Sequence, residues 1–448
     1  MNFVPRPLRI AVIGSGITGL SAAWLLATRH RVTLYESGPR LGGHSNTLTV
    51  ELGGMRAPVD TGFIVYNEDT YPNLVAMFDH LGVPTKHSDM SFAVSLDGGA
   101  LEYCGSGIGG VFAQRRNALR PRFWSMLSSL VRFYRAARAQ TQDIGEITLD
   151  EYLDRGGYSQ AFRELHLYPM AAAIWSTPAG RVGDYPAAAF IRFCQNHKLL
   201  ELGDRPQWRT VDGGSKVYVE KLARMIGEDI RLATPVREIR RSEDGGVTVF
   251  DGLGGSDTFD HVVLATHADQ SLAMLGDADA DEERVLGAFK YSKNLAVLHT
   301  DQRLMPMRRS VWSSWNYIAD GGADKRPPSI TYWMNRLQGL PLREDVFVSL
   351  NSVRAPRDEA IIREIPYEHP LFDSRALAAQ PQVWSLQGRR NTWFCGAWMG
   401  AGFHEDGLQS GLAVAEALGG VRRPWLVPGE SSRVFVGPPP VVAGAELA

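Results

Sequence analysis

The chain has 448 residues, with 47 Lys or Arg against 49 Asp or Glu, so its formal net charge is −2. Hydrophobic residues make up 44% and charged residues 21%, a composition typical of globular proteins and unlike that of disordered chains. The length predicts two or three domains. The near-neutral charge argues against nucleic acid as a partner, because domains that bind nucleic acid carry a strong basic excess.

Cysteine content and hydropathy indicate the cellular compartment in which the protein is expected. Cys104, Cys194 and Cys395 are odd in number and far apart, which suits a reducing environment better than a disulfide framework. No run approaches the roughly 18 apolar residues of a membrane-spanning helix, and residues 1–9 do not lead into the apolar centre of a signal peptide. We expect a cytoplasmic protein. The chain has no His/Cys cluster at metal-ligand spacing, so no metal is expected.

The chain begins with a predicted strand (8–13), a glycine-rich turn (14–19), a helix, and a second strand (31–35) that ends at Glu36. In a dinucleotide site the first glycine permits a tight turn, the second lets the pyrophosphate approach the backbone, and the third lets helix and strand pack closely. The free amides of the helix start meet the diphosphate, and the acid accepts hydrogen bonds from ribose hydroxyls. The predicted nucleotide-binding residues are Gly14, Gly16, Ile17, Thr18, Gly19 and Glu36.

Residues 105–110 have the same glycine spacing as the turn at 14–19 and can be compared with it. They are followed by Arg115, Arg116 and Arg120, and no acid occurs between Glu102 and Asp143. A second strand with a ribose-binding acid is therefore missing, and we interpret this pattern as a loop rather than a second nucleotide site.

The continuation after Glu36 indicates which dinucleotide binds. Residues 37–44 read SGPRLGGH, where a second glycine pair again lets backbone approach a cofactor and Arg40 offers a guanidinium near the phosphates. This extended pattern resembles the superfamily of flavin-containing amine oxidases, phytoene desaturases and protoporphyrinogen oxidases. The resemblance implies FAD as the cofactor, held in this stretch by Ser37, Arg40, Gly42, Gly43 and His44. A structural imidazole is the alternative for His44.

A late segment repeats the order of strand, glycine-rich loop and helix, over residues 391–418. Asp406 is a predicted N-cap, and a helix start at this point would lower the energy of a negatively charged reduced flavin. Superfamily members use this turn for that purpose, which implies that Gly396, Asp406, Gly407, Leu408 and Gln409 contact the cofactor. The resemblance also matches Val236 to the position whose backbone contacts adenine. A purely structural turn is the alternative.

The resemblance implies an α/β fold in which a Rossmann-like FAD-binding domain, of the GR2 type found in amine oxidases, is interleaved with an α+β substrate domain. We assign residues 1–75, 205–285 and 386–420 to the discontinuous FAD-binding domain. Residues 76–204 and 286–385 form the substrate domain, and residues 421–448 form a poorly ordered tail.

A basic segment, Arg115 to Arg138, has seven arginines and no acids, interleaved with apolar residues at helical spacing. A helix of this kind lies in a membrane interface with its arginines near anionic lipid, which would place the protein peripherally at the inner face of the membrane. A surface helix packed on its own domain is the alternative.

Several phrases resemble a narrower bacterial flavoprotein group whose members occur alongside cyclopropane-fatty-acid-synthase-like methyltransferases. They lie at residues 173–176, 193–200, 206–211, 213–215 and 332–335. The resemblance implies dehydrogenation or desaturation of a fatty acyl chain, free or within a phospholipid, by hydride transfer to flavin N5. The alternatives are an amine oxidase or a carotenoid- or porphyrinogen-type dehydrogenase, a non-redox FAD-dependent mutase or isomerase, and a scaffold without catalysis.

A base would have to lie within hydrogen-bond reach of the substrate proton. The candidates are His404 and Glu405, which flank the proposed flavin turn, and His197. Lys293 precedes a predicted strand at 295–299, but its register is not determined by the sequence.

Overall fold

The structure is a computed structural model that describes residues 6–140, 144–175, 182–196, 198–201, 203, 206–242, 245–319, 329–352 and 354–438. Of the predicted proton acceptors, His197 lies outside these residues. Within them, every helix is too short or too polar to cross a membrane, and Cys104, Cys194 and Cys395 are buried free thiols.

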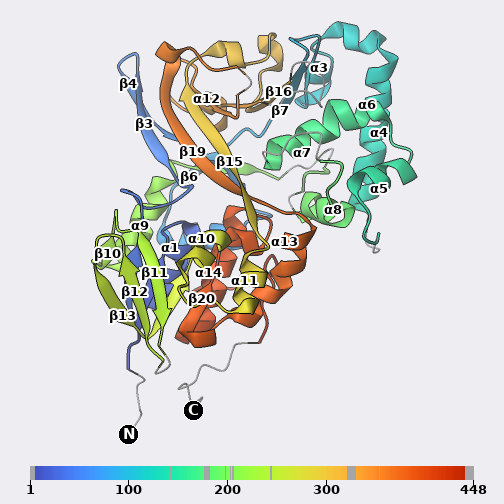
Figure 1. The fold of residues 1–448 in the computed structure, drawn as a ribbon. Coiled ribbons are helices and arrows are strands. Elements are labelled where there is room, and N and C mark those ends of the chain that lie inside the picture. Colours follow the sequence, from blue (N-terminus) through green and yellow to red (C-terminus); the bar gives the residue numbers. More distant parts are fainter. Residues whose placement is uncertain are drawn as a thin grey trace.

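A five-stranded parallel sheet forms the nucleotide-binding domain, in the lower part of Figure 1. Its order is β10 (Ile230–Arg231), β2 (Arg31–Tyr35), β1 (Arg9–Ile13), β14 (His261–Leu264) and β20 (Thr392–Phe394). The central strands are buried along almost their whole length, as expected of parallel strands covered on both faces. The α/β fold class and its parallel nucleotide-binding sheet are confirmed.

Helices cover this sheet and complete the domain. Helix α1 (Ile17–Ala27) packs against α14 (His404–Gly419) and α9 (Lys216–Ile226). An antiparallel meander of β11 (Val236–Arg241), β12 (Val247–Asp251) and β13 (Ser256–Phe259) lies beside it, followed by α10 (Ala268–Met274) and α11 (Ala280–Leu286).

A seven-stranded sheet forms the second domain. Its order is β19 (Ile361–Leu371), β15 (Lys290–His299), β18 (Phe347–Leu350), β17 (Ser329–Trp333), β16 (Trp315–Ala319), β7 (Phe92–Leu96) and β8 (Leu101–Cys104). Strands β15 and β19 pair along their whole length and run from the lower domain into the upper one (Figure 1). Helix α12 (Met334–Leu337) follows β17.

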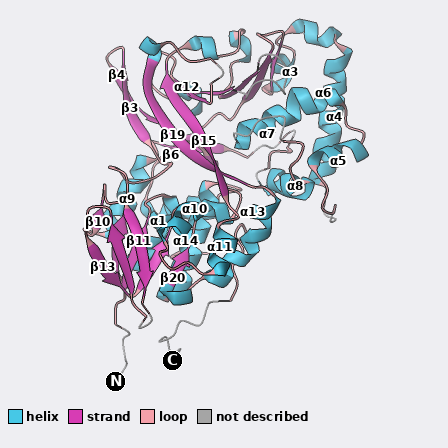
Figure 2. Cartoon of the chain, in the orientation of Figure 1, coloured by secondary structure: helices cyan, strands magenta, loops and turns pink. Residues whose placement is uncertain are grey.

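A group of helices extends from one side of this sheet (Figure 2). They are α3 (Gly107–Val111), α4 (Pro121–Arg138), α5 (Leu149–Arg155), α6 (Gln160–Phe162), α7 (Tyr168–Trp175) and α8 (Ala187–Asn196), with a π-helical turn at Arg163–Leu167 between α6 and α7. Phe133, Phe162 and Phe190 are fully buried in their shared core. Residues 105–110 differ from the predicted loop, because they lead from the antiparallel strand β8 into the short helix α3 (Gly107–Val111).

Smaller elements join the two domains. Strands β3 (Thr47–Leu52) and β4 (Met55–Asp60) form a hairpin, while β5 (Tyr66–Asn67), β9 (Trp208–Val211) and β6 (Thr85–His87) form a small sheet next to α2 (Pro72–Leu81). Two segments differ from the expected boundaries. The hairpin packs on the core of the second domain, whereas α13 (Ser374–Ala379) and the turn Gln380–Leu386 pack into the nucleotide-binding core.

The segment 421–438 also differs from the expected poorly ordered tail, because it packs against the nucleotide-binding domain. Arg423 is 2% exposed and donates hydrogen bonds to Glu416 and Asn73. The ring of Trp425 stacks on that of Trp24, with centroids 5.7 Å apart. Buried polar and aromatic contacts of this kind hold a segment that has no regular secondary structure.

Candidate functional site

The three glycines of the first loop have different steric surroundings. Gly14 has φ of 98°, and a Cβ atom there would stand 2.7 Å from the carbonyl oxygen of Ala265. A Cβ at Gly19 would stand 1.9 Å from the carbonyl oxygen of Gly14. A Cβ at Gly16 would meet no atom within 4 Å. Gly14 and Gly19 are therefore required by the fold, whereas Gly16 borders open space that the protein itself does not use.

The start of α1 carries amide groups suited to an anion. Gly16 is its N-cap, no side chain caps the helix, and its first turn holds no acid. The first amides of a helix have no partner within it and lie at its positive end. Ile17 and Thr18 therefore present backbone donors next to the open space at Gly16, an arrangement that binds phosphate.

The second glycine pair lies on the first loop. The amide of Gly42 donates to the carbonyl of Ser15 at 2.9 Å, and a Cβ at Gly43 would stand 3.1 Å from the Cα of Gly16. Arg40 differs from its expected orientation toward the phosphates. Its guanidinium donates to the carbonyls of Leu41, Gly43 and Ser45, so it braces this second loop.

Glu36 lies at the end of β2, beside the first loop. One carboxylate oxygen accepts from the amide and hydroxyl of Ser15, at 3.1 and 2.5 Å, and the other accepts from the amide of Gly38 at 2.7 Å and from the hydroxyl of Ser37 at 3.2 Å. The amide of Thr234 donates to the carbonyl of Glu36, which brings the start of β11, at Val236, to the same end of the sheet.

The late glycine-rich loop meets the first loop directly. Gly396 is held through its amide and carbonyl by the hydroxyl of Ser410, and Leu408 is fully buried. A Cβ at Gly407 would stand 2.7 Å from the Oγ1 atom of Thr18. The starts of α1 and α14 therefore lie side by side, although they come from opposite ends of the chain.

The start of α14 differs in detail from the expected cap. The helix begins at His404 with Phe403 as N-cap, so Asp406 lies in its first turn, where its carboxylate accepts from the amide of Phe403 at 2.8 Å. The side chain of Arg433 approaches the other oxygen of Asp406, at 3.5 Å. Gln409 accepts a hydrogen bond from the amide of Arg433.

Glu405 is engaged by a neighbouring helix. Its carboxylate accepts from the amides of Asn73 and Leu74 at the start of α2, and from the side-chain amides of Asn73 and Gln409, at 2.8 to 3.1 Å. The side chain is fully buried. Glu405 is thus the cap of α2, and all its acceptor positions point at protein donors rather than at a substrate.

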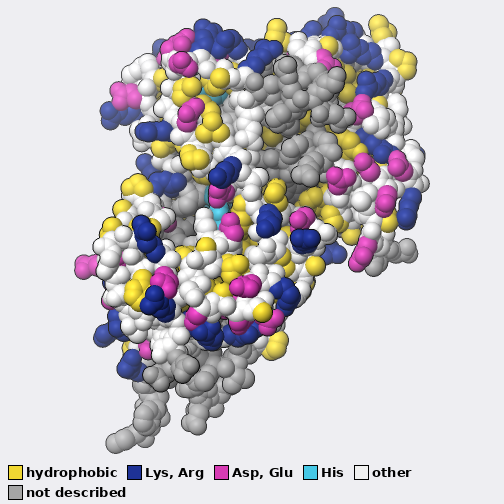
Figure 3. All heavy atoms as spheres, viewed as in Figure 1, with side chains coloured by type: hydrophobic (Ala, Val, Ile, Leu, Met, Phe, Trp, Pro, Cys, Tyr) yellow, Lys and Arg dark blue, Asp and Glu magenta, His cyan; other side chains and the backbone are white. Residues whose placement is uncertain are grey.

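The half-buried imidazoles of His44, His369 and His404 lie near one another, with the ring centroids of His44 and His369 5.4 Å apart. We call the region that they border the hollow. Figure 3 shows histidine atoms at depth between the upper and lower parts of the molecule. Burial lowers the pKa of His404 to about 3 and that of His369 to about 4, and lowers the pKa of His44 well below its usual value. These imidazoles are neutral near pH 7.

Contacts from both domains fix the imidazole rings. His404 Nε2 lies 2.7 Å from the hydroxyl of Tyr218 and 3.0 Å from that of Ser45, and its ring stacks on Phe63 at 3.7 Å. His44 stacks on Tyr367, with centroids 4.8 Å apart.

One polar atom in the hollow has no protein partner. The Nε2 atom of His44 is buried and forms no hydrogen bond within the part of the chain that is described. Since buried polar groups are almost always paired, this atom and the open space at Gly16 fit a bound ligand that spans both. The two positions are joined by Gly43, which precedes His44 and touches Gly16.

Sequence reasoning missed Ser45, Phe63, Tyr218, Tyr367 and His369. None of them belongs to a motif, and their convergence depends on long-range packing. Lys293 lies in β15 opposite Glu368, on an exposed part of that strand.

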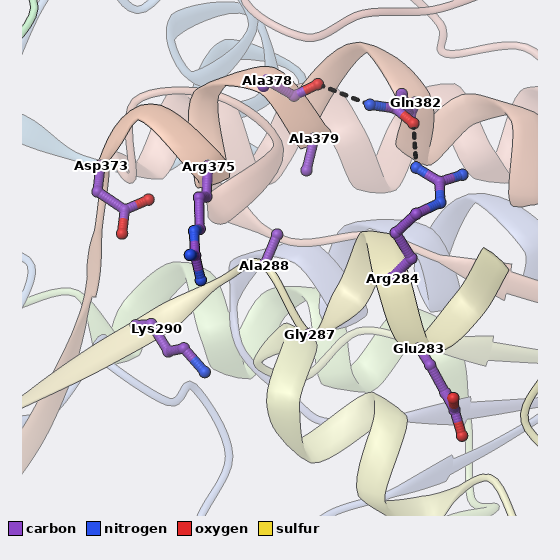
Figure 4. Close-up of a pocket in the computed structure, with 10 residues that line it drawn as sticks. All are labelled: Glu283, Arg284, Gly287, Ala288, Lys290, Asp373, Arg375, Ala378, Ala379 and Gln382. Atoms are coloured by element: carbon purple, nitrogen blue, oxygen red, sulfur yellow. Dashed lines mark hydrogen bonds between the residues drawn. The ribbon is translucent and has the colours of Figure 1, made fainter. Parts of the chain in front are cut away.

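A separate cavity of about 460 Å³ lies between α11 and α13 (Figure 4). Arg375 and Lys290 extend into it, while Arg284 is held by Gln382. It includes none of the predicted cofactor-binding residues, so it is distinct from the hollow.

The fold and the paired glycine loops define a dinucleotide-binding protein with a second domain built on a seven-stranded sheet. The family model described as flavin containing amine oxidoreductase matches residues 17–298. The chain belongs to this family, and FAD is its cofactor. The superfamily resemblance and the oxidoreductase class that it implies are confirmed.

Individual relatives match in different ways. The carotenoid phi-ring synthase of Chlorobaculum tepidum is 41% identical over 78 residues, which are 17% of this chain and 12% of that protein. The matched region is thus a small part of that relative. Among solved structures, a fatty acid isomerase from P. acnes that produces CLA has a TM-score of 0.63 at 18% identity, covering 91% of this chain and 98% of that one. Cyclohexylamine oxidase from Brevibacterium oxydans IH-35A has a TM-score of 0.63 at 16% identity, covering 92% and 100%. These two similarities establish the fold alone.

Proposed function

We propose that this protein is a FAD-dependent oxidoreductase that dehydrogenates an apolar substrate, a fatty acyl chain that is free or part of a phospholipid. The observation that supports this substrate is the neutrality of the hollow. Its imidazoles are uncharged near pH 7, and the carboxylates of Glu405 and Asp406 are engaged by α2 and by Arg433. A substrate with a charged group at its reacting part would need an opposite charge in the hollow to compensate for the desolvation of that group, whereas the methylene part of an acyl chain needs none.

Aromatic side chains supply apolar surface at the same place. Phe63 stacks on His404, and Phe403 stacks on Phe193 of α8, with centroids 5.3 Å apart. Phe403 precedes α14 and so connects the proposed flavin turn to the helical part of the second domain. A methylene chain gains about 0.8 kcal/mol per CH₂ group when such surface removes it from water.

We propose a cofactor site that runs along the two glycine loops. In this site the diphosphate would be held by Gly14, Gly16, Ile17, Thr18 and Gly19, the ribose by Glu36 and Ser37, and the adenine by Val236. Gly42, Gly43 and His44, together with Gly396 and residues 406–409, border the flavin end, and Arg40 braces the second loop. Bound FAD supplies the two-electron acceptor. The positive end of α14 favours negative charge beside it.

The imidazole of His404 acts as a positioning group in this proposal. Because its pKa is about 3, the ring stays neutral near pH 7 and is a weak base, and its Nε2 atom is within hydrogen-bond distance of the hydroxyls of Tyr218 and Ser45. Glu405 is assigned a structural role as the cap of α2. His197 is the remaining proposed acceptor for the substrate proton.

Anaerobic flavin spectroscopy tests the substrate class. The oxidised holoenzyme is mixed with micellar fatty acids, with phospholipids, and with primary amines as the comparison. We expect acyl substrates to bleach the visible flavin band, and mass spectrometry to find a product two hydrogens lighter. Rapid reduction by an amine, with no response to acyl lipids, would overturn the proposal.

A double-bond isomerase is the second candidate, because the similar solved structure from P. acnes is described as a fatty acid isomerase. The same experiment separates the two reactions. An isomerase would convert an unsaturated fatty acid to a product of equal mass while the flavin stays oxidised at the end of turnover.

A further inference from the structure

An exposed apolar tip lies at the far end of the helical part of the second domain, at the upper right of Figure 1. It consists of Ile108 of α3, Leu119 at the end of the 3-10 turn Arg115–Leu119, and Trp124 of α4, which are 82%, 86% and 52% exposed. Soluble surfaces rarely group large apolar side chains in this way, and such groups mark interaction sites.

The three side chains belong to one continuous surface. The Nε1 atom of Trp124 donates to the carbonyl of Ala118, the neighbour of Leu119, at 2.9 Å. The ring of Trp124 lies 5.4 Å from that of Phe112, which follows Ile108 by one helical turn.

Positive charge surrounds the apolar tip. Residues 103–142 contain seven arginines and no Asp or Glu, and Figure 3 displays Lys and Arg side chains beside hydrophobic ones at the upper right, over α3 and α4. Arg116 and Arg120 donate to the carbonyl of Ala100, and among the described residues no carboxylate forms an ion pair with either of them. Arg122 pairs with Glu164, and Arg115 is exposed.

The apolar stripe of α4 is not available to a partner. Phe123, Met126 and Phe133 are fully buried against the rest of the protein, so the packed-helix interpretation holds for this face. Contact of this basic segment with lipid would therefore be made by the apolar tip rather than along the length of α4.

We infer that the apolar tip inserts into the interface of an anionic bilayer, with Arg115, Arg116 and Arg120 at the lipid headgroups. Tryptophan and aliphatic side chains favour this interface, and each nearby arginine raises partitioning onto anionic lipid about fivefold. Charge complementarity is the reason for choosing anionic lipid. The inference rests on the proposed function in one respect, because a bilayer would deliver an acyl substrate.

Vesicle cosedimentation of the holoenzyme tests the inference. The vesicles contain either phosphatidylcholine alone or phosphatidylcholine with 30 mol% phosphatidylglycerol (about a third anionic, enough to set a negative surface potential). We expect binding to the anionic vesicles, with release at high salt. A triple variant that carries Ile108→Glu, Leu119→Glu and Arg115→Glu should reduce the bound fraction at least tenfold.

Matched controls lie on the nucleotide-binding domain. Leu253 is 73% exposed and Arg224 of α9 is also exposed, so Leu253→Glu with Arg224→Glu changes charge and hydrophobicity at a distant surface and should leave binding unchanged. The inference is overturned if the wild-type protein ignores anionic vesicles, if both sets of variants bind equally, or if a duplex DNA competitor removes the protein from the vesicles. Reduction of the flavin by micellar acyl substrate is measured separately. Vesicle binding without that reduction would refute the proposed substrate and leave the membrane surface intact.

Discussion

Gly407 lies against Thr18, so closely that a Cβ atom on the glycine would stand 2.7 Å from the threonine Oγ1 atom. This contact joins the first turn of α14 to the first turn of α1. The two first turns therefore lie side by side, which supports the proposal that a single dinucleotide interacts with two loops that are far apart in the sequence.

Substitutions at Gly16 and Gly19 should separate cofactor binding from folding. Gly16→Val places its side chain in space that no protein atom occupies, so the apoprotein should fold normally while FAD affinity falls at least about tenfold. Gly19→Ala collides with the Gly14 carbonyl and should lower stability by about 1–3 kcal/mol or more. Thermal unfolding of the apoproteins and the ratio of flavin to protein after purification measure both effects. Equal loss of stability in the two variants would contradict this assignment.

Glu405→Ala should act on stability. It removes the acceptor for the amides of Asn73 and Leu74, and unpaired buried donors should lower the free energy of unfolding by about 2–4 kcal/mol. Turnover per folded, flavin-loaded molecule should change little. Asp373→Ala is a matched control, since Asp373 caps α13 through one hydrogen bond to Ala376 and is exposed, and should lose only about 1 kcal/mol. A large fall in kcat without loss of stability would instead make Glu405 a catalytic residue.

Arg433→Met should destabilise the start of α14. The Asp406 carboxylate is fully buried, and loss of its positive neighbour should cost about 3–5 kcal/mol. Adding Asp406→Asn removes the unpaired charge and should restore part of that stability. Urea unfolding of the single and double variants measures the coupling between the two side chains. Additive effects would mean that Arg433 does not act through Asp406.

Acid stability should depend on His404. Its pKa is about 3 in the folded protein against 6.5 for an unperturbed histidine, so between these values the unfolded chain binds more protons. The free energy of unfolding should fall as the pH decreases from about 6.5 toward 4, by up to about 1.4 kcal/mol per pH unit for this residue, and should be independent of it above that range. His404→Gln should show a shallower slope, while His87→Gln, at an exposed position, should follow the wild type.

The local sequence pattern was sufficient to predict the elements of the first glycine loop. Gly14, Gly19 and the strand that ends at Glu36 could be predicted because turn geometry and close helix–strand packing restrict residue type over a short span. The cap of α14 was placed three residues too late, since Asp406 is a common N-cap residue and Phe403 is not.

Contacts between residues far apart in the chain could not be predicted from the sequence. The pairing of Arg433 with Asp406 and the engagement of Glu405 by α2 join segments that no periodicity relates. The seven-stranded sheet likewise brings Tyr367 to His44.

The sequence by itself determined the α/β class, the family and the dinucleotide loop, because each depends on residue types at fixed short spacing. The tertiary structure alone decided that the carboxylates of Glu405 and Asp406 are engaged by protein groups, and which surface of the basic segment faces water. Both features depend on which side chains the folded chain buries. A carboxylate becomes a helix cap, and an imidazole stays neutral, only when distant parts of the chain close around it.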